Sequence, residues 1–234
     1  MGKKKSIAII GSGISGLSSA YFLRDKYDLT VYEKNAVLGG HSRTISILTK
    51  NQKKLEVDTG FIVLNDRTYP LLNKLLKDIK IEIKDTEMSF SISTNNGQLE
   101  WAGSSLNTLF AQRKNLFNLS MLRGVLDILK FNAYAKDFIK KSPNLSLGEL
   151  IQKMNLKAWF RDYYILPMGG AIWSCPSNTM LNFPATTFVN FFENHGLLSL
   201  KNRPQWHTLK NKSKEYVRAL EISIEKNGII KKKY

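Results

Sequence analysis

Residues 7–16 read Ile7-Ala8-Ile9-Ile10-Gly11-Ser12-Gly13-Ile14-Ser15-Gly16, so an apolar run passes directly into a G-x-G-x-x-G pattern. A short apolar run that ends in glycine is typical of a buried parallel strand, and residues 17–24 continue with helical spacing. Residues 29–33 predict a second parallel strand. We therefore expect a βαβ unit of about 30 residues with a right-handed crossover.

Each glycine of this pattern has a separate physical role. Gly11 permits the sharp turn out of the strand, Gly13 lets a pyrophosphate approach the backbone, and Gly16 lets helix and strand pack closely. The phosphates would lie against unpaired amides at a helix N-terminus. Glu33 ends the second strand, where a carboxylate accepts hydrogen bonds from ribose hydroxyls and repels a 2′-phosphate. The pattern therefore predicts a dinucleotide site that disfavours NADP.

Beyond Gly40 the chain changes its pattern. The spacing predicts strands over 44–48, 54–58, 79–84, 89–93 and 99–101, the last three forming an antiparallel sheet. It predicts helices over 69–77, 185–194 and 214–224, and over most of 104–164. A last strand is expected at 228–230.

A stripe of leucines marks the long helical region, at Leu116, Leu119, Leu122, Leu126 and Leu129. We interpret this stripe as a helix core and not as a membrane-facing surface. Ser146, with Glu149 three residues later, predicts the start of a shorter helix. His195 precedes Gly196 in a helix-ending context, so we expect it to cap a helix and not to act as a base.

The composition argues against several classes of protein. The formal net charge of +16 arises from 35 Lys and Arg against 19 Asp and Glu. These basic residues are spread along the chain, so we expect no nucleic-acid partner, and peripheral contact with a membrane stays open. No stretch reaches the ~18 apolar residues that span a bilayer. One cysteine and three histidines argue against a zinc site and a disulfide, so we expect no metal and a cytoplasmic setting.

The sequence from the end of the second predicted strand onward distinguishes FAD from NAD as the expected cofactor. It reads Glu33-Lys34-Asn35-Ala36-Val37-Leu38-Gly39-Gly40-His41-Ser42-Arg43-Thr44. Here the sequence resembles the FAD-dependent amine oxidoreductase superfamily, which includes monoamine oxidases, protoporphyrinogen oxidase and phytoene desaturases. Residues 58–62, Asp-Thr-Gly-Phe-Ile, resemble that superfamily's next element, which passes near the flavin ring. Segments 167–174, 183–185 and 194–198 resemble a bacterial subgroup of predicted NAD/FAD-binding proteins.

The resemblance implies FAD as the cofactor and assigns residues to its parts. The pyrophosphate would be surrounded by the glycine turn, namely Gly11, Ser12, Gly13, Ile14, Ser15 and Gly16. The adenosine ribose would be bordered by Glu33 and Lys34. The phosphate or ribityl path would be lined by Gly40 and His41, and the isoalloxazine ring by Gly60, Phe61 and Ile62. Many relatives have arginine at the position of His41, whose neutral imidazole can still donate one hydrogen bond.

The implied fold class is α/β, with an incomplete Rossmann-like FAD/NAD(P)-binding domain, an inserted antiparallel sheet and a helical substrate domain. We expect residues 1–78 to form the FAD-binding βαβ domain, 79–205 the substrate domain, and 206–234 a partial return to the FAD domain. Relatives are commonly longer and re-enter the FAD domain with a Gly-Asp element, so the resemblance implies a C-terminally truncated chain. They also have a glycine pair where this chain reads Lys210-Asn211-Lys212-Ser213.

These features support one hypothesis and two alternatives. The first is an FAD-dependent oxidoreductase of the amine oxidase type, which moves a hydride equivalent from a C–N or C–C bond of a small-molecule substrate to flavin. The sequence nominates no catalytic residue for it. The second is a truncated or split remnant, a nucleotide-binding module without independent turnover that a second chain would complete. The third is a small binding module for NAD or ADP.

Overall fold

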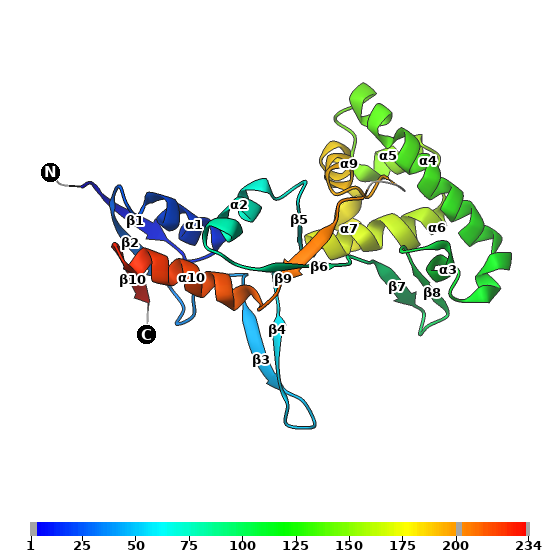
Figure 1. Ribbon diagram of the computed structural model, residues 1–234. Helices are drawn as coiled ribbons and strands as arrows, with labels where there is room; N and C mark the ends of the chain where they lie inside the picture. The colour runs from blue at the N-terminus through cyan, green and yellow to red at the C-terminus, as the bar shows by residue number, and fades with distance from the viewer. Residues whose placement is uncertain (1–3, 200–202, 233–234) are drawn as a thin grey trace. The chain divides into compact units, whose positions relative to one another are not determined.

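The computed structural model describes residues 4–199 and 203–232, which fall into two compact units (Figure 1). Unit 1 contains the chain up to Glu87 and from Gln205 onward, and unit 2 contains Met88–Pro204. Each unit has its own hydrophobic core. The chain therefore leaves unit 1 once and returns to it near the C-terminal end of the sequence.

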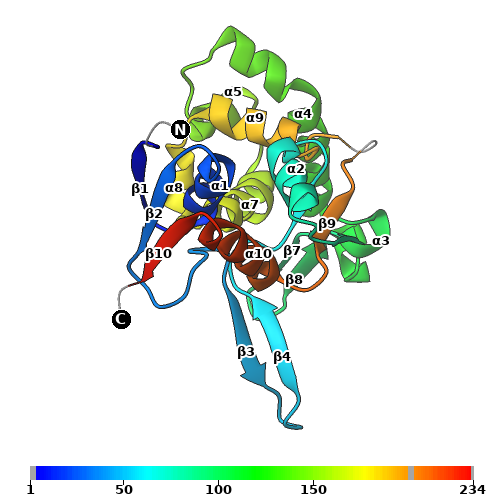
Figure 2. The same ribbon diagram turned by 60° about the vertical axis from the view of Figure 1, so that its left-hand side comes forward.

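Unit 1 is built on a parallel sheet of three strands, β1 (Ser6–Ile10), β2 (Asp28–Glu33) and β10 (Gly228–Lys232), in the order β1-β2-β10. Helices α1 (Ile14–Leu23) and α10 (Ser213–Glu225) lie together on one side of it (Figure 2). Their apolar residues pack with those of the strands around Leu29 and Val31, which are buried. The predicted strand–turn–helix–strand unit is confirmed, and so is a last strand near residue 228.

The other face of this sheet is open. Ile10, Tyr32 and Ile229 point to the same side, because Ile10 pairs with Tyr32 and neighbouring partners share a face. These side chains are 82%, 41% and 57% exposed. Within 4–199 and 203–232, no strand pairs with the outer edge of β1. The expectation of a strand buried on both faces is therefore wrong for β1, because helices cover only one face of the sheet.

The rest of unit 1 is antiparallel sheet and one helix. Strands β3 (Thr44–Leu48) and β4 (Lys54–Asp58) lie where strands were predicted, and they pair with each other as a hairpin. A second small sheet has the order β5-β9-β6, from Leu64–Asn65, Trp206–Leu209 and Ile83–Thr86. Helix α2 spans Pro70–Asp78. The expected sheet of three neighbouring strands is wrong in one respect, since β6 pairs with β9 and not with the strand that follows it.

Unit 2 is a helical unit with one hairpin. The hairpin consists of β7 (Ser91–Thr94) and β8 (Leu99–Ala102). The helices are α3 (Leu106–Leu109), η1 (Arg113–Phe117), α4 (Leu119–Lys141), α5 (Leu147–Lys153), α6 (Ala158–Phe160), η2 (Arg161–Ile165), α7 (Leu166–Trp173), α8 (Ser177–Leu181) and α9 (Ala185–Asn194). The capping box of Ser146 and Glu149 starts α5, and His195 follows the last turn of α9, as predicted.

Helix α4 buries a different face from the one that the leucine stripe predicted. Its buried residues are Met121, Gly124, Asp127, Phe131, Ala135 and Ile139. Leu116, Leu119, Leu126 and Leu129 are exposed, so the interpretation of the stripe as a helix core is wrong. The reason is the close approach of Trp159 to Gly124, where an added Cβ would lie 2.1 Å from Trp159 Cε3. The indole ring of Trp159 can approach the helix this closely only because Gly124 has no Cβ.

Among the helices that the structure describes, none is both long and apolar enough to cross a membrane.

Candidate functional site

The turn between β1 and α1 has a separate steric reason for each glycine. Gly11 has a φ of +92°, and its N–H donates a hydrogen bond to the Tyr32 carbonyl at 2.8 Å. A Cβ on Gly16 would lie 1.9 Å from the Gly11 carbonyl oxygen, so only glycine fits between helix and strand. Gly13 has an ordinary φ of −65°, and an added Cβ there would meet nothing within 4 Å. Space therefore lies open in front of Gly13.

Helix α1 begins at this open space. Gly13 is its N-cap residue and offers no side chain to cap the first amides. Ile14 and Ser15, in the first turn, are exposed. Free amides and the positive end of the helix dipole make such a terminus a binding site for an anion such as phosphate. The geometry thus offers a phosphate position at Gly13.

Glu33 ties the end of β2 to the glycine turn. Its Oε2 accepts hydrogen bonds from the Ser12 amide, at 2.9 Å, and from the Ser12 hydroxyl. Its Oε1 accepts from the backbone amide and the side-chain amide of Asn35, at 2.8 and 3.2 Å. A carboxylate has about four lone-pair sites, so these contacts use all of them. Ser12 is fully buried and Glu33 is nearly so.

These hydrogen bonds keep Glu33 ionised. Hydrogen bonds from the Ser12 hydroxyl and from the Asn35 amide lower the pKa of Glu33 from 4.5 to about 2, against the opposing effect of burial. A negative charge therefore stays beside the glycine turn throughout the physiological pH range. This charge disfavours a phosphate on a nearby ribose, as the sequence predicts for NADP.

The second glycine pair packs directly onto the first glycine turn. The Gly39 amide donates a hydrogen bond to the Ser12 carbonyl at 3.0 Å, and Gly39 forms a parallel bridge with Gly13. Gly40 has a φ of +58°, and its Cβ would lie 3.2 Å from Gly13 Cα. A side chain at Gly40 would press against Gly13, whereas a Cβ on Gly39 would lie 2.6 Å from the Ser42 carbonyl oxygen. The pair therefore serves close backbone packing at the edge of the open space.

The remaining predicted residues continue this surface. A Cβ on Gly60 would lie 1.9 Å from the His41 carbonyl oxygen, so these two backbones touch. The Ile62 carbonyl accepts a hydrogen bond from the Thr208 hydroxyl at 2.7 Å. Lys34, His41 and Ile62 are exposed, and Phe61 is half-buried. Gly13, Gly40, His41 and Gly60 thus form one continuous series of contacts within unit 1.

The structure differs from the sequence-based expectation in the partners of Glu33. We expected its carboxylate to be free for ribose hydroxyls, whereas Ser12 and Asn35 occupy it here. Of the other predicted residues, Ser12 is buried, and those that are exposed are Ile14, Ser15, Lys34, Gly40, His41, Gly60 and Ile62. The role of each predicted residue toward a cofactor stays a prediction.

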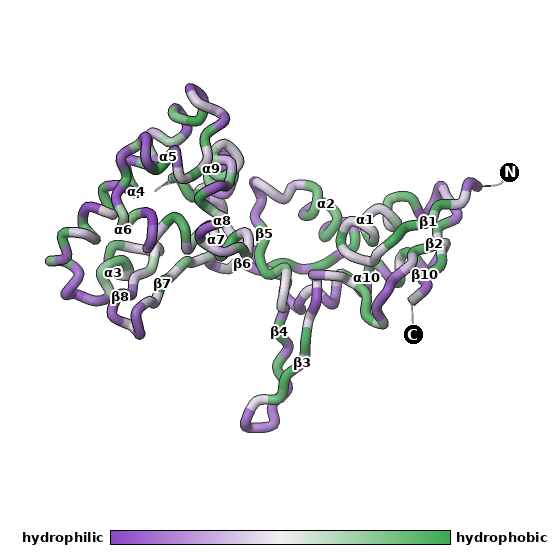
Figure 3. The backbone as a smooth tube through the Cα atoms, turned by 180° about the vertical axis from the view of Figure 1, so that it is seen from behind, coloured by the Kyte–Doolittle hydropathy of each residue, from purple (hydrophilic) through white to green (hydrophobic). Residues whose placement is uncertain are grey.

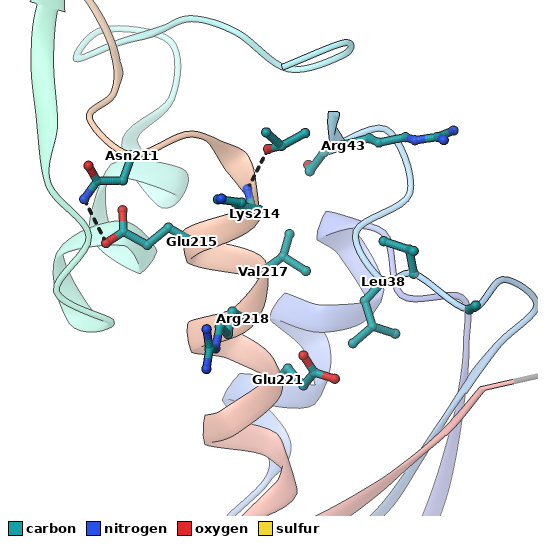
Figure 4. Close-up of a pocket in the computed structure, with 12 residues that line it drawn as sticks. Leu38, Arg43, Asn211, Lys214, Glu215, Val217, Arg218 and Glu221 are labelled. Carbon is teal, nitrogen blue, oxygen red and sulfur yellow. Dashed lines mark hydrogen bonds between the residues drawn. The ribbon is translucent and has the colours of Figure 1, made fainter. Parts of the chain in front are cut away.

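A cavity of about 530 Å³ lies elsewhere in unit 1, between residues 36–44 and helix α10 (Figure 4). None of the predicted cofactor residues lines it. Val217 and Glu221 lie on the side of α10 that faces Leu38, and Arg43 points away from the helix. Sequence reasoning missed this cavity because its two walls are far apart in the chain.

Helix α10 packs against the Gly39-Gly40 pair. A Cβ on Gly39 would lie 3.0 Å from Val217 Cγ2, and the buried hydroxyl of Tyr216 donates a hydrogen bond to Ser42. The Asp58 carboxylate accepts hydrogen bonds from the Ser213 amide, at 3.1 and 3.2 Å, and so caps the start of α10. Sequence reasoning did not assign these positioning roles, because each joins residues more than 150 positions apart.

A lysine takes the place of glycine just before α10. Lys212, the N-cap residue, has φ 74° and ψ 166°. This backbone region is almost confined to glycine, because a Cβ is strained there. Lys212 lies in the segment where proteins of the resembling superfamily have a glycine pair.

No metal site accompanies these features, since the described residues contain no group of three or more His, Cys, Asp or Glu side chains that could hold a metal ion.

Comparison with known proteins agrees with this geometry. The family model described as "NAD(P)-binding Rossmann-like domain" matches residues 9–79. Coproporphyrinogen III oxidase of Staphylococcus aureus is 25% identical over an alignment of 262 residues, which covers 96% of this chain and 52% of that protein. An oxidoreductase from Methanosarcina mazei superposes with a TM-score of 0.61 at 18% identity, over 97% of this chain and 51% of that one. Putrescine oxidase bound to putrescine gives a TM-score of 0.60 at 18% identity, over 97% and 51% of the two chains.

The chain has a fold similar to that of putrescine oxidase and of the Methanosarcina mazei oxidoreductase. The resemblance inferred from residues 33–44 and 58–62 is confirmed, and so is the α/β fold class with its Rossmann-like domain. The chain spans about half the length of these amine oxidoreductase-like relatives. The matched residues 9–79 contain the glycine turn, Glu33, the Gly39-Gly40 pair and Gly60.

Proposed function

We propose that this chain is an FAD-dependent oxidoreductase of the amine oxidase type. The observation that carries the proposal is the open space at Gly13, in front of the uncapped N-terminus of α1 and beside the Glu33 carboxylate. A Cβ added at Gly13 would meet no atom within 4 Å, which supports the approach of a diphosphate to this backbone. The named relatives are oxidases or oxidoreductases, which supports the same reaction class.

The residues of the glycine turn would hold the diphosphate through the amides of Ile14, Ser15 and Gly16. Glu33 and Lys34 would border the ribose. Two of the donors to Glu33 are side chains, the Ser12 hydroxyl and the Asn35 amide, and these can give way to ribose hydroxyls while the backbone donors remain. Gly40 and His41 would follow the phosphate or ribityl path, with Gly60, Phe61 and Ile62 beside the isoalloxazine ring.

FAD, when bound, supplies the acceptor for a hydride equivalent from a C–N or C–C bond of the substrate. The protein residues bind the cofactor, fix its orientation and keep a negative charge at Glu33. The relatives differ in their named substrates, a porphyrinogen and putrescine, so we propose the reaction class and not the substrate.

The open face of the parallel sheet favours a second candidate function. Ile10, Tyr32 and Ile229 expose apolar surface on this face, and the outer edge of β1 lacks a partner among residues 4–199 and 203–232. Exposed strand edges bind further strands. The second candidate is therefore a nucleotide-binding module without turnover of its own, whose sheet a second polypeptide completes.

An absorption spectrum tests the first proposal. The purified chain should show flavin absorbance, or acquire it after incubation with FAD and removal of free flavin by gel filtration. NAD added in excess serves as the competitor, and we expect it not to displace FAD. A folded, colourless protein that takes up no FAD would overturn the proposal. Retention of FAD without oxidation of any amine tested would favour the binding module.

A further inference from the structure

A histidine on the strand that returns to unit 1 lies between two carboxylates. Strand β9 is the middle strand of the small sheet β5-β9-β6, whose outer strands can be followed in Figure 3. His207 of β9 has its Nδ1 3.0 Å from Asp85 Oδ1, on β6, and its Nε2 3.2 Å from Asp66 Oδ2, just after β5. His207 is buried, and both aspartates are exposed. One buried ring therefore bridges carboxylates from both sides of its strand.

Both contacts of His207 are hydrogen bonds only when the ring carries two protons. A neutral imidazole has one N–H, and its other nitrogen is an acceptor, whereas an imidazolium donates from both nitrogens. A neutral His207 would therefore place a ring lone pair against one of the two carboxylates. The arrangement of the ring and the carboxylates is thus one that an imidazolium satisfies completely and a neutral ring only in part.

Other charged residues lie on these strands or next to them in the chain, namely Arg67, Glu82, Lys84, Glu87 and Lys210. Lys84 pairs with Thr208, the residue after His207, so its side chain lies on the opposite face of the sheet. Lys210 donates a hydrogen bond to the Glu82 carboxylate. Among the described residues, the two aspartates are therefore the charged groups within hydrogen-bonding distance of the ring.

The His207 bridge anchors a segment that leads away from the proposed flavin position. Residues 60–62 run directly into β5, which is two residues long and pairs with β9 through Leu64 and Asn65. The Ile62 carbonyl accepts a hydrogen bond from the Thr208 hydroxyl, so β9 also holds this segment before β5 begins. So short a strand depends on side-chain contacts across the sheet. The contact between His207 and Asp66 is such a tie, and it lies at the far end of β5.

We propose that His207 is a pH-sensitive positioning residue, which bridges Asp66 and Asp85 while it carries both ring protons and thereby holds residues 60–62 in place. Both hydrogen bonds are present while the ring is doubly protonated. One of them is lost as the pH rises through the range in which imidazole gives up a proton, about 5 to 8. The effect on flavin rests on the proposed function, whereas the bridge itself does not.

Hydrogen exchange of residues 60–68 in the full chain, followed by mass spectrometry, tests the bridge without cofactor. After correction for the intrinsic pH dependence of exchange, protection in wild type should fall severalfold between about pH 5 and 8. In His207→Gln, whose amide does not titrate, protection should not depend on pH. In Asp66→Asn, the new amide donates to the lone pair of a neutral ring, so the protection seen at low pH should persist at high pH.

The matched control is Asp78→Asn, which removes the same charge at an exposed site at the end of α2 in unit 1. Its exchange should follow wild type at every pH. Protection in wild type that does not change with pH, or a wild-type pH dependence in Asp66→Asn, would overturn the proposal. Asp66→Asn decides the question by itself if His207→Gln fails to fold.

Quenching of flavin fluorescence extends the test to the proposed cofactor. The affinity of wild type for FAD should weaken severalfold between about pH 5 and 8, whereas the affinity of Asp66→Asn should stay constant. Equal weakening in the two proteins would overturn the positioning of residues 60–62 by His207. If wild type takes up no FAD at any pH, the proposed function fails, and hydrogen exchange still decides whether the bridge is pH-sensitive.

Discussion

The Glu33 carboxylate accepts hydrogen bonds from both the amide and the hydroxyl of Ser12, a residue 21 positions earlier in the chain. This contact joins the end of β2 to the turn that follows β1. It fixes the glycine turn before any cofactor binds, so the network serves both stability and the proposed binding site.

Glu33 should make stability depend on pH in the acid range. Its folded pKa is lowered to about 2 from 4.5, so its contribution is fully present above pH 4.5 and is lost as the pH falls toward 2. A shift of this size corresponds to about 3 kcal/mol in the free energy of unfolding. Glu33→Gln should therefore be less stable than wild type at pH 7 and show a flatter loss of stability between pH 4.5 and 2. Urea unfolding at several pH values measures this.

The control for this prediction is Glu225→Gln, because Glu225 is exposed at the end of α10. It should follow the wild-type curve. If the free energy of unfolding of Glu33→Gln fell with pH between 4.5 and 2 as steeply as that of wild type, the hydrogen bonds to Glu33 would not be the source of the pH dependence.

Lys212→Gly should stabilise the protein. The φ of 74° and ψ of 166° at Lys212 strain a residue with a Cβ by about 1–3 kcal/mol. Glycine removes this strain and loses about 0.5–1 kcal/mol through greater freedom of the unfolded chain. We expect a net gain of about 1 kcal/mol in the free energy of unfolding, measured by urea denaturation. Lys226→Gly, at a φ of −65°, should not be stabilising, and a loss of stability in Lys212→Gly would refute the strain.

Gly124→Ala should destabilise unit 2 although alanine favours helices. The new Cβ would lie 2.1 Å from Trp159 Cε3, and the crowding should cost about 1–3 kcal/mol, more than the ~1 kcal/mol gained in helix propensity. Ser120→Ala, at an exposed site of the same helix, is the control and should change stability little. Thermal unfolding followed by circular dichroism compares the two variants. A melting temperature of Gly124→Ala at or above that of wild type would contradict the packing described for Trp159.

Local signals in the sequence were sufficient for part of this fold. Gly11, Gly13 and Gly16 predict their turn because each steric demand arises within a few residues, and Ser146 with Glu149 predicts a helix start for the same reason. The positions of strands β3 and β4 were likewise predicted from short segments of sequence. Each of these features is determined by residues that are close to one another in the sequence.

Features that depend on distant partners were not predictable. Strand β6 pairs with β9, so Ile83 finds its partner at Leu209. Helix α4 has apolar residues on two faces with the same spacing, and the choice between them depends on Trp159 packing at Gly124. In the candidate site, the position of Glu33 at the end of the second strand was predictable. The hydrogen bonds that Ser12 and Asn35 donate to its carboxylate were not, because they form only in the folded turn.

The affinity of Gly13→Ala for FAD, measured by quenching of flavin fluorescence, tests the central claim most directly. Its Cβ meets nothing in the protein, so the variant should keep the wild-type free energy of unfolding within about 0.5 kcal/mol. It should bind FAD at least about tenfold more weakly than wild type, a difference of about 1.4 kcal/mol, because the Cβ occupies the proposed phosphate position. Gly16→Ala, whose Cβ would lie 1.9 Å from the Gly11 oxygen, should instead lose stability. Equal FAD affinity of Gly13→Ala and wild type would contradict a phosphate site at Gly13.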